Sequence, residues 1–379
     1  MFDYTSNLCD NRFKILAKNL VHYSCEIKKG DHVLLDLPAG EEVFAKELIR
    51  AVYTAGGLPY LEYSNDVLFK EWLENISEEQ LILEAGWQKM RMEQMQAYIG
   101  VRAKENLYEL ANIANEKKQL HCLLLSHPVH HDIRVKKTKW VILRYPNPSM
   151  AQEAHMPTED FRNFYFDVCN LDYARLSAAM TPLVELMNKT DKVTIIAPGT
   201  HLQFSIKGIS AVKCDGKRNI PDGEVYTAPV KNSVEGYITY NVPSPHEGLV
   251  YSNIRLEFSQ GKIIKAESSP FTESLNKAFD TDEGARYIGE FALGLNPYIK
   301  NPAHDILFDE KICGSFHFTP GCCYDEADNG NRSALHWDLV KILREDFGGG
   351  EIYFDGKLIQ KNGLFCLPEL ECLNPDQLI

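Results

Sequence analysis

Short apolar runs alternate with segments of helical periodicity through the first half of the chain. Residues 31–37 form the kind of short apolar run that suits a buried strand, and 42–55 follow with apolar residues at helical spacing that stop at Gly56-Gly57. Further strands are predicted at 58–63, 95–101 and 140–145, and a further helix at 105–115. This strand–helix order predicts an α/β domain, with a mostly parallel sheet and helices on both faces.

The pattern changes after a long helical passage at 158–188. Strand-like stretches separated by turns then predominate, at 193–197, 236–241, 254–258, 262–266 and 351–359. One helix is predicted among them, at 272–295. The second half therefore indicates an α+β domain rich in antiparallel strands, and the predicted domains are 1–190 and 191–379.

Composition and charge narrow the possible functions. The chain has 379 residues, enough for two domains, and its 25% charged and 44% apolar residues are typical of a globular protein. The formal charge is −13, and no basic run is present, so we expect neither nucleic acid nor an anionic membrane as a partner. No stretch approaches the roughly 18–20 uninterrupted apolar residues of a membrane span.

The start of the chain and its cysteines bear on the compartment. Residues 1–6 contain an early acid and lack the basic-then-apolar order of a secretory signal. Ten cysteines are scattered along the chain without a CxxC pair, which is typical of reduced thiols rather than a disulfide framework. These features predict a cytoplasmic protein.

The α/β half invites a search for nucleotide-binding fingerprints. No GxGxxG follows a strand, and neither GxxxxGK[ST] nor the GxSxG of serine hydrolases is present. The three glycines at 348–350 precede a predicted strand, so they cannot place a phosphate at a helix N-terminus. The first half therefore carries no recognisable chemistry of its own.

The sharpest chemical signal lies at 335–339, where three apolar residues alternate with His336 and Asp338. On a strand, the apolar side chains would enter the core, and the imidazole and carboxylate would project together and reach one metal ion. On a helix the same pair would point about 200° apart. The alternative is a histidine and an aspartate on the solvated face of an amphipathic strand, which is the commoner origin of such a pair.

Four further residues in the second half could take part in the same chemistry. Glu310 and His317 are close in sequence, although His317, between two aromatics, could equally be a satisfied core histidine. Glu290 lies among small and apolar residues late in the predicted long helix, where a buried carboxylate must be paired or liganded. Glu224 lies between a turn and a strand, where many acids belong only to the turn.

Together these positions supply four carboxylates and two imidazoles. Oxygen ligands mixed with imidazole suit Zn, Co or Mn rather than Ca, and more carboxylates than one ion needs indicate two ions. Two ions about 3.5–4 Å apart can hold a bridging hydroxide and stabilise both sides of a hydrolytic intermediate. The six residues therefore suggest a hydrolytic metal site, provided that the fold brings them together.

The motifs, taken in order, resemble the thermophilic-type leucyl aminopeptidases, the family of aminopeptidase T, aminopeptidase S and PepS-like enzymes. The matching segments are PDGEVYTAP at 221–229, YIGEFALG at 287–294, LFDEKICGSFHFTPG at 307–321, Tyr324, and SALHWDLV at 333–340. The resemblance implies a metalloaminopeptidase that hydrolyses the N-terminal peptide bond of peptides through hydroxide activated by two divalent ions, Zn, Co or Mn. It also implies a homodimer whose N-terminal domains help to enclose the active sites.

The resemblance also implies a role for each site residue. The implied metal ligands are Glu224, Glu290, Glu310, His317, His336 and Asp338. Glu290 is further expected to act as the general base, Asp338 to bridge the ions, and Tyr324 to stabilise the oxyanion. The loop from Tyr324 to His336 looks shorter than in some relatives, and Glu310 and His317 are separated by slightly more residues. The resemblance therefore does not predict the shape of the substrate pocket.

Two other functions remain open at this point. An iron-dependent ring-cleaving dioxygenase on the same scaffold would need a site of two histidines and one carboxylate, and the excess of glutamates argues against it. A non-catalytic binding protein is the second alternative, but competent residues occupy all six ligand positions.

The histidines at 127, 130 and 131 superficially suggest another metal site. Pro128 is expected to break a helix there, and no carboxylate pattern accompanies them, so we expect a surface loop or an interdomain contact.

Overall fold

The computed structural model describes residues 10–103, 105–106 and 108–379. Its internal contacts divide the chain into two compact units. Unit 1 comprises Met1–Gln152, Met156–Asn170 and Gly216–Ile220; unit 2 comprises Glu153–His155, Leu171–Asp215 and Pro221–Ile379. This division assigns the helix α8 (Tyr173–Met187) to unit 2, whereas the domain boundary between residues 190 and 191 stays a prediction.

Unit 1 is built on a five-stranded sheet of order β2-β1-β3-β4-β8, in which every pairing is parallel. Its strands are β1 (His32–Pro38), β2 (Leu58–Ser64), β3 (Ala97–Arg102), β4 (Lys139–Arg144) and β8 (Asn219–Ile220). The two central strands β1 and β3 are almost wholly buried, which explains why they appear in the sequence as continuous apolar runs. The predicted parallel sheet is confirmed.

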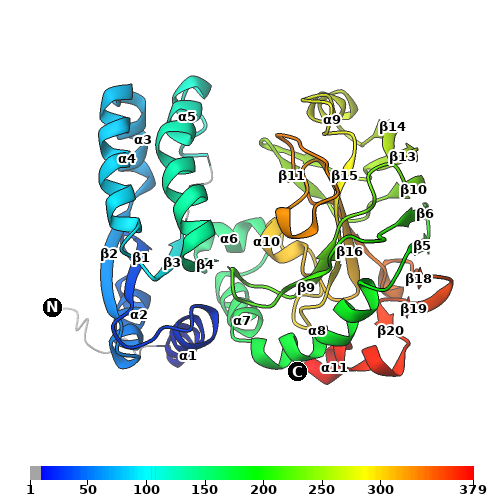
Figure 1. Cartoon of the computed structure of the whole chain (residues 1–379), viewed down its shortest axis with the longest axis horizontal. Coiled ribbons are helices and arrows are strands. Elements are labelled where there is room, and N and C mark those ends of the chain that lie inside the picture. Colours follow the sequence, from blue (N-terminus) through cyan, green and yellow to red (C-terminus); the bar gives the residue numbers. More distant parts are fainter. Residues whose placement is uncertain (1–9, 104, 107) are drawn as a thin grey trace. The chain divides into compact units, whose positions relative to one another are not determined.

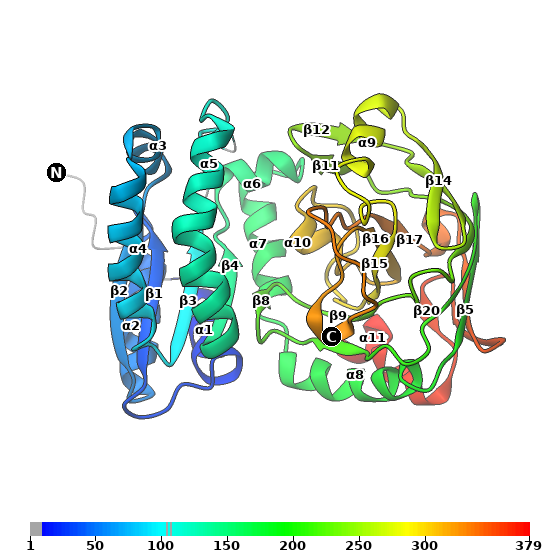
Figure 2. The same cartoon turned by 45° about the horizontal axis from the view of Figure 1, so that its top comes forward.

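Helices alternate with the strands of unit 1. They are α1 (Asn11–Asn19), α2 (Glu42–Thr54), α3 (Asp66–Asn75), α4 (Glu78–Met92), α5 (Asn115–His121), α6 (Pro148–Glu153) and α7 (Thr158–Cys169), with π-helical segments at Leu20–Ser24 and Cys122–Val135. Figures 1 and 2 show α4 side by side with the rod that α5 and its π-helical continuation form, and these elements pack on each other. The helix α1 packs instead on α2 and α7.

The helix predicted at 105–115 is wrong. In the described part of this segment the backbone forms tight turns, and α5 begins only at Asn115. The side chain of Asn106 accepts a hydrogen bond from the amide of Tyr108, and the Ala111 and Ile113 amides bond three residues back rather than four. Asparagine thus offers the backbone a local alternative to the helix, which periodicity does not reveal.

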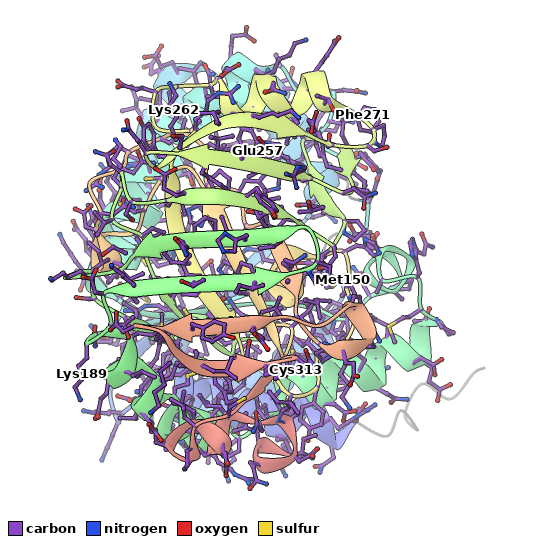
Figure 3. The ribbon with its side chains drawn as sticks, turned by 90° about the vertical axis from the view of Figure 1, so that its right-hand side faces the viewer. Met150, Lys189, Glu257, Lys262, Phe271 and Cys313 are labelled. Carbon is purple, nitrogen blue, oxygen red and sulfur yellow. The ribbon has the colours of Figure 1, made fainter. Side chains whose placement is uncertain are left out.

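Unit 2 contains two antiparallel sheets packed face to face. The larger has the order β14-β13-β10-β6-β5-β18-β19-β20 and is seen face-on in Figure 3; the smaller has the order β17-β16-β15-β9-β7. Phe204 of the larger sheet contacts Phe291 and Phe318 of the smaller, with ring centroids 5.0 Å apart in both cases. The predicted antiparallel α+β unit is confirmed.

The strands of unit 2 have short, well-defined bounds. The larger sheet contains β5 (Lys192–Ala197), β6 (Thr200–Ser205), β10 (Glu235–Thr239), β13 (Arg255–Ser259), β14 (Lys262–Glu267), β18 (Glu351–Phe354), β19 (Lys357–Lys361) and β20 (Leu364–Phe365). The smaller contains β7 (Val212–Cys214), β9 (Glu224–Thr227), β15 (Ile288–Gly294), β16 (Ser315–Pro320) and β17 (Val340–Ile342), and a separate hairpin contains β11 (Ser244–His246) and β12 (Leu249–Tyr251). The remaining α-helices are α9 (Thr272–Phe279), α10 (Ile306–Asp309) and α11 (Pro375–Leu378), and short 3-10 helices lie at Asp325–Ala327, Glu345–Phe347 and Pro368–Leu373.

The long helix predicted at 272–295 is wrong in its second half. The helix α9 ends at Phe279, and the central strand β15 follows. All seven residues of β15 are buried, so the strand has no polar alternation that would distinguish it from a buried helix. Gly289 is required there, because a Cβ would lie 2.3 Å from the carbonyl oxygen of Cys322. Glu290 therefore projects from a strand and not from a helix.

Two further expectations concern membranes and thiols. Within the described residues, no helix is long and apolar enough to cross a membrane. The cysteines that the structure describes are all free thiols, as their spacing predicted.

Candidate metal centre

Three neighbouring strands bring the first group of predicted ligands together. The central strand β15 pairs with β9 on one side and β16 on the other, and these strands carry Glu290, Glu224 and His317 respectively. The Nε2 atom of His317 lies 3.1 Å from Oε1 of Glu290, and its Nδ1 atom lies 3.8 Å from Oε2 of Glu224. All three residues are buried, with at most 4% of their surface exposed.

The second group comes from the extended segment before β17. This segment makes one isolated bridge, between His336 and Gly321, but its three apolar residues are buried as the alternation predicted. His336 and Asp338 project together, so that Nε2 of His336 lies 3.2 Å from Oδ1 of Asp338 and 3.4 Å from Oε2 of Glu290.

Glu290 belongs to both groups. One of its oxygens faces His317 and the other faces His336, so the ligand atoms form one set with Glu224 and another with Asp338, each within 4.8 Å. Three buried atoms at these positions have no hydrogen-bond partner in the structure: Oε2 of Glu224, Nδ1 of His317 and Nε2 of His336. Buried polar atoms are rarely left unpaired, and these three are of the kinds that bind divalent metals. The residues present therefore fit a pair of metal ions that share Glu290.

The electrostatics of the two groups also favour cations. Burial alone would lower the pKa of His317, but the charges of Glu224 and Glu290 raise it to about 10. The pKa of His336 is raised to about 12, because Asp338 and Glu290 outweigh the effect of burial. Both shifts have the same cause, which is the negative charge of the carboxylates that surround the two imidazoles. Divalent ions would neutralise that charge in place of the two protons.

Glu310 lies beside these groups and belongs to neither of the two sets of three. It follows α10, and its Oε1 atom accepts a hydrogen bond from the ammonium group of Lys311. Burial raises the pKa of Glu310 to about 8. The role of Glu310 as a metal ligand stays a prediction.

Tyr324 stands at the edge of the second group. Its ring centroid lies 4.8 Å from that of His336 and 5.6 Å from that of Tyr226, and 47% of the residue is exposed. Burial of its hydroxyl end and the charge of Glu290 raise the pKa of Tyr324 above its ordinary value. The phenol therefore stays protonated at neutral pH and can donate a hydrogen bond.

Several supporting groups were missed in the sequence. The hydroxyl of Thr319 donates to Oδ1 of Asp338 at 2.7 Å, and Nδ1 of His336 lies 2.8 Å from the carbonyl oxygen of Cys322. A carbonyl oxygen only accepts, so Nδ1 of His336 carries the proton and Nε2 is left for a metal. Lys311 and Asp222 were also missed. The one available signal was that Thr319 shares a strand face with His317, two residues earlier.

We predict that Thr319→Val lowers kcat about tenfold, because valine keeps the shape of threonine but cannot orient Asp338. The measurement is the steady-state rate together with metal content. The matched control is Thr227→Val, which removes a buried hydroxyl that donates to the backbone of Ile209 at 3.3 Å. Equal rates for the two variants would show that the bond to Asp338 has no role.

The histidines at 127, 130 and 131 of unit 1 lie in a helical segment and not in the surface loop that was expected. Pro128 does not break the helix but lies inside the π-helical segment Cys122–Val135, whose wider turn accommodates the missing amide. His127 and His131 stack with ring centroids 4.4 Å apart beside Asp132. Both rings are exposed, and Lys136 already pairs with Asp132 at 3.1 Å. The cluster therefore lacks two features of the candidate metal centre, which are burial and buried ligand atoms without a hydrogen-bond partner.

Sequence comparison identifies the family. The sequence model of the thermophilic metalloprotease (M29) family matches residues 9–365. The chain belongs to this family. The predicted resemblance is thereby confirmed, and membership of a metalloprotease family implies a divalent metal cofactor.

Individual relatives of this M29 chain are aminopeptidases. Aminopeptidase AmpS of Bacillus subtilis (strain 168) is 28% identical over 178 residues, which cover 43% of this chain and 42% of the relative. Aminopeptidase T of Thermus thermophilus is 32% identical over 154 residues, 36% of this chain and 37% of that protein. These matches span about two-fifths of either relative. Aminopeptidase 2 of Geobacillus stearothermophilus is 23% identical, and that match covers 92% of this chain and 94% of the relative.

Solved structures share the fold across nearly the whole chain. Wild-type AmpT from Thermus thermophilus has a TM-score of 0.78 at 22% identity and covers 94% of this chain and 99% of its own. A 2,5-dihydroxypyridine dioxygenase from Pseudomonas putida KT2440 has a TM-score of 0.59 at 16% identity. That match covers 95% of this chain and 98% of the dioxygenase chain. At these identities each likeness shows the fold alone.

Proposed function

We propose that this M29 chain is a metal-dependent aminopeptidase that hydrolyses the N-terminal peptide bond of peptides. The observation that carries the proposal is the shared position of Glu290 between two sets of buried ligands. A site with two adjoining sets of ligands suits hydrolysis, in which charge must be stabilised on both the attacking and the attacked oxygen. The aminopeptidase relatives support the same substrate class.

Glu224, Glu290 and His317 would hold one divalent ion, and Glu290, His336 and Asp338 the other, with Glu310 as an additional ligand. The mixture of carboxylates and imidazoles favours Zn, Co or Mn. Such ions, when bound, lower the pKa of a water molecule toward neutrality and polarise the scissile carbonyl.

The side chains of the protein supply the remaining steps. Glu290 accepts the proton of the attacking water and delivers it to the leaving amine, as a general base and then a general acid. Burial opposes its ionisation, but the neighbouring imidazoles of His317 and His336 lower the pKa of Glu290, so its side chain is ionised and can accept a proton. The protonated hydroxyl of Tyr324 donates to the carbonyl oxygen as negative charge develops there.

We predict that Tyr324→Phe lowers kcat by about 10²-fold and leaves metal content unchanged, because the ring remains and only the donor to the oxyanion is lost. The measurement combines steady-state kinetics with metal analysis of the purified variant. Loss of metal instead would mark Tyr324 as structural, and an unchanged kcat would remove it from the reaction.

The substrate class can be tested directly with paired peptides. Each short peptide is offered with a free and with an acetylated N-terminus, and released amino acid is measured. Cleavage of the free-amine peptides alone is expected, since the α-ammonium group would bind a carboxylate or a metal ion of the site. Equal cleavage of both forms would indicate an endopeptidase, and cleavage of neither would contradict the proposal.

We further propose a cytoplasmic homodimer. The family resemblance supports dimerisation, and β2 is an edge strand of its sheet with Leu58, Leu61 and Tyr63 exposed. An exposed apolar edge strand is a place where a second copy can pair. Analytical ultracentrifugation of the wild-type protein measures the oligomeric state.

A further inference from the structure

A buried lysine lies directly behind the proposed metal centre. Lys311 is only 1% exposed, and its Nζ atom lies 2.7 Å from Oε1 of Glu224 and 3.8 Å from Oδ1 of Asp222, and also contacts Glu310. Removing an ammonium group from water is costly unless carboxylates compensate it. A lysine retained at this depth therefore needs these acidic neighbours.

The backbone holds Lys311 firmly in this place. Its amide donates to the carbonyl of Phe308, and its own carbonyl accepts from the amide of Asn296, both at 3.0 Å. The end of β15 passes so close that a Cβ on Gly294 would lie 2.3 Å from the carbonyl oxygen of Ile312, the next residue. The fold thus fixes the backbone of Lys311, and the neighbouring carboxylates hold its ammonium group.

Lys311 divides the two oxygens of Glu224 between different tasks. Oε1 is held by the ammonium group, whereas Oε2 has no hydrogen-bond partner and lies 3.8 Å from Nδ1 of His317. We propose that Lys311 is a positioning residue that holds Glu224 so that a single oxygen, Oε2, is presented to the ion of the first ligand group. This inference rests on the proposed metal centre but does not depend on peptide hydrolysis.

The same geometry explains a third set of potential ligands. Cys214, Asp222 and Glu224 offer atoms within 4.8 Å of one another, but Nζ of Lys311 lies between the two carboxylates and takes the place of an ion. The five carboxylates of this region are Asp222, Glu224, Glu290, Glu310 and Asp338. Two divalent ions and one ammonium group balance their charge, so the lysine serves as a built-in third cation.

The test is Lys311→Met in the full chain, loaded with Co²⁺ and studied without substrate. Methionine keeps the length of the side chain but frees Glu224 to rotate. We expect the visible absorption of bound Co²⁺ to change, and one of the two ions to bind about 10- to 100-fold more weakly, as is usual when a group that orients a ligand is lost. Wild-type absorption and affinity for both ions would overturn the inference.

The matched control is Lys341→Met. Lys341 is also buried, 4% exposed, but its ammonium group donates to the backbone carbonyls of Pro198 and Thr239. This variant loses a buried lysine without releasing a carboxylate, so it should keep the wild-type Co²⁺ spectrum. If both variants alter the spectrum equally, Lys311 acts only through general stability and the inference is wrong.

A second variant covers the case in which Lys311→Met does not fold. Lys311→Met combined with Asp222→Asn also removes one of the negative charges that faced the ammonium group. It should still show the altered spectrum, because no ammonium group then holds Oε1 of Glu224. A wild-type spectrum in the double variant would contradict the inference. Because no substrate is present, an inactive wild-type protein would refute the aminopeptidase proposal and leave this result intact.

Discussion

Glu290→Gln should reduce turnover by at least about 10³-fold and leave the protein folded with at least one metal ion bound through the remaining carbonyl oxygen. Glutamine keeps the length of the side chain and one carbonyl oxygen, but it cannot accept the proton of the attacking water, and loss of general base catalysis costs this order of magnitude. Release of amino acid from a free-amine peptide measures the rate, and atomic absorption measures the metal.

The outcome separates two roles of the same residue. If Glu290→Gln binds no metal, its charge matters chiefly for holding the ions, because both its oxygens face ligand groups. If the variant keeps wild-type rates, the assignment of Glu290 as the base is wrong.

His317→Ala is expected to have an effect of similar size through a different cause. The imidazole is buried between Glu224 and Glu290 and is the proposed nitrogen ligand of the first group, so its removal should release one ion of the pair. Activity should fall by about 10³-fold or more, since hydrolysis then lacks half of the charge stabilisation. Metal equivalents per chain, determined after dialysis against metal-free buffer, provide the measurement.

The control for this variant is His131→Ala. His131 is an exposed histidine of unit 1 whose neighbours are Asp132 and His127, so its loss should leave metal content and rate unchanged. Retention of both ions in His317→Ala would contradict the first ligand group.

Local patterns allowed much of the fold to be predicted. The helix α2 is recognisable because its apolar residues recur at helical spacing and stop at two glycines, and β1 because it is a short, continuous apolar run followed by a turn. The strand β15 was mistaken for a helix because burial on both faces removes the alternation that marks a strand. Secondary structure at such positions depends on partners far away in the sequence, which no local window contains.

Most of the side chains that the fold brings together in this site were predicted from the sequence, but the groups that support them were not. His336 and Asp338 were found because their alternation with apolar residues fixes a shared face, and the structure confirms that their side chains meet. The burial of Lys311 could not be predicted, because a lysine beside a glutamate in the sequence is usually exposed to solvent and no local pattern indicates otherwise. Thr319 of β16 donates a hydrogen bond to Asp338 of the extended segment before β17, a relation that exists only after folding.

The central claim is that two divalent ions, held by two ligand groups that share Glu290, are required for peptide hydrolysis. It is tested most directly by stripping the wild-type protein of metal and adding Co²⁺ in steps, while amino acid release from a free-amine peptide is recorded. The account predicts no turnover in the stripped protein and a rise that levels off at two equivalents per chain. Full turnover after stripping, or a plateau at one equivalent, would contradict it.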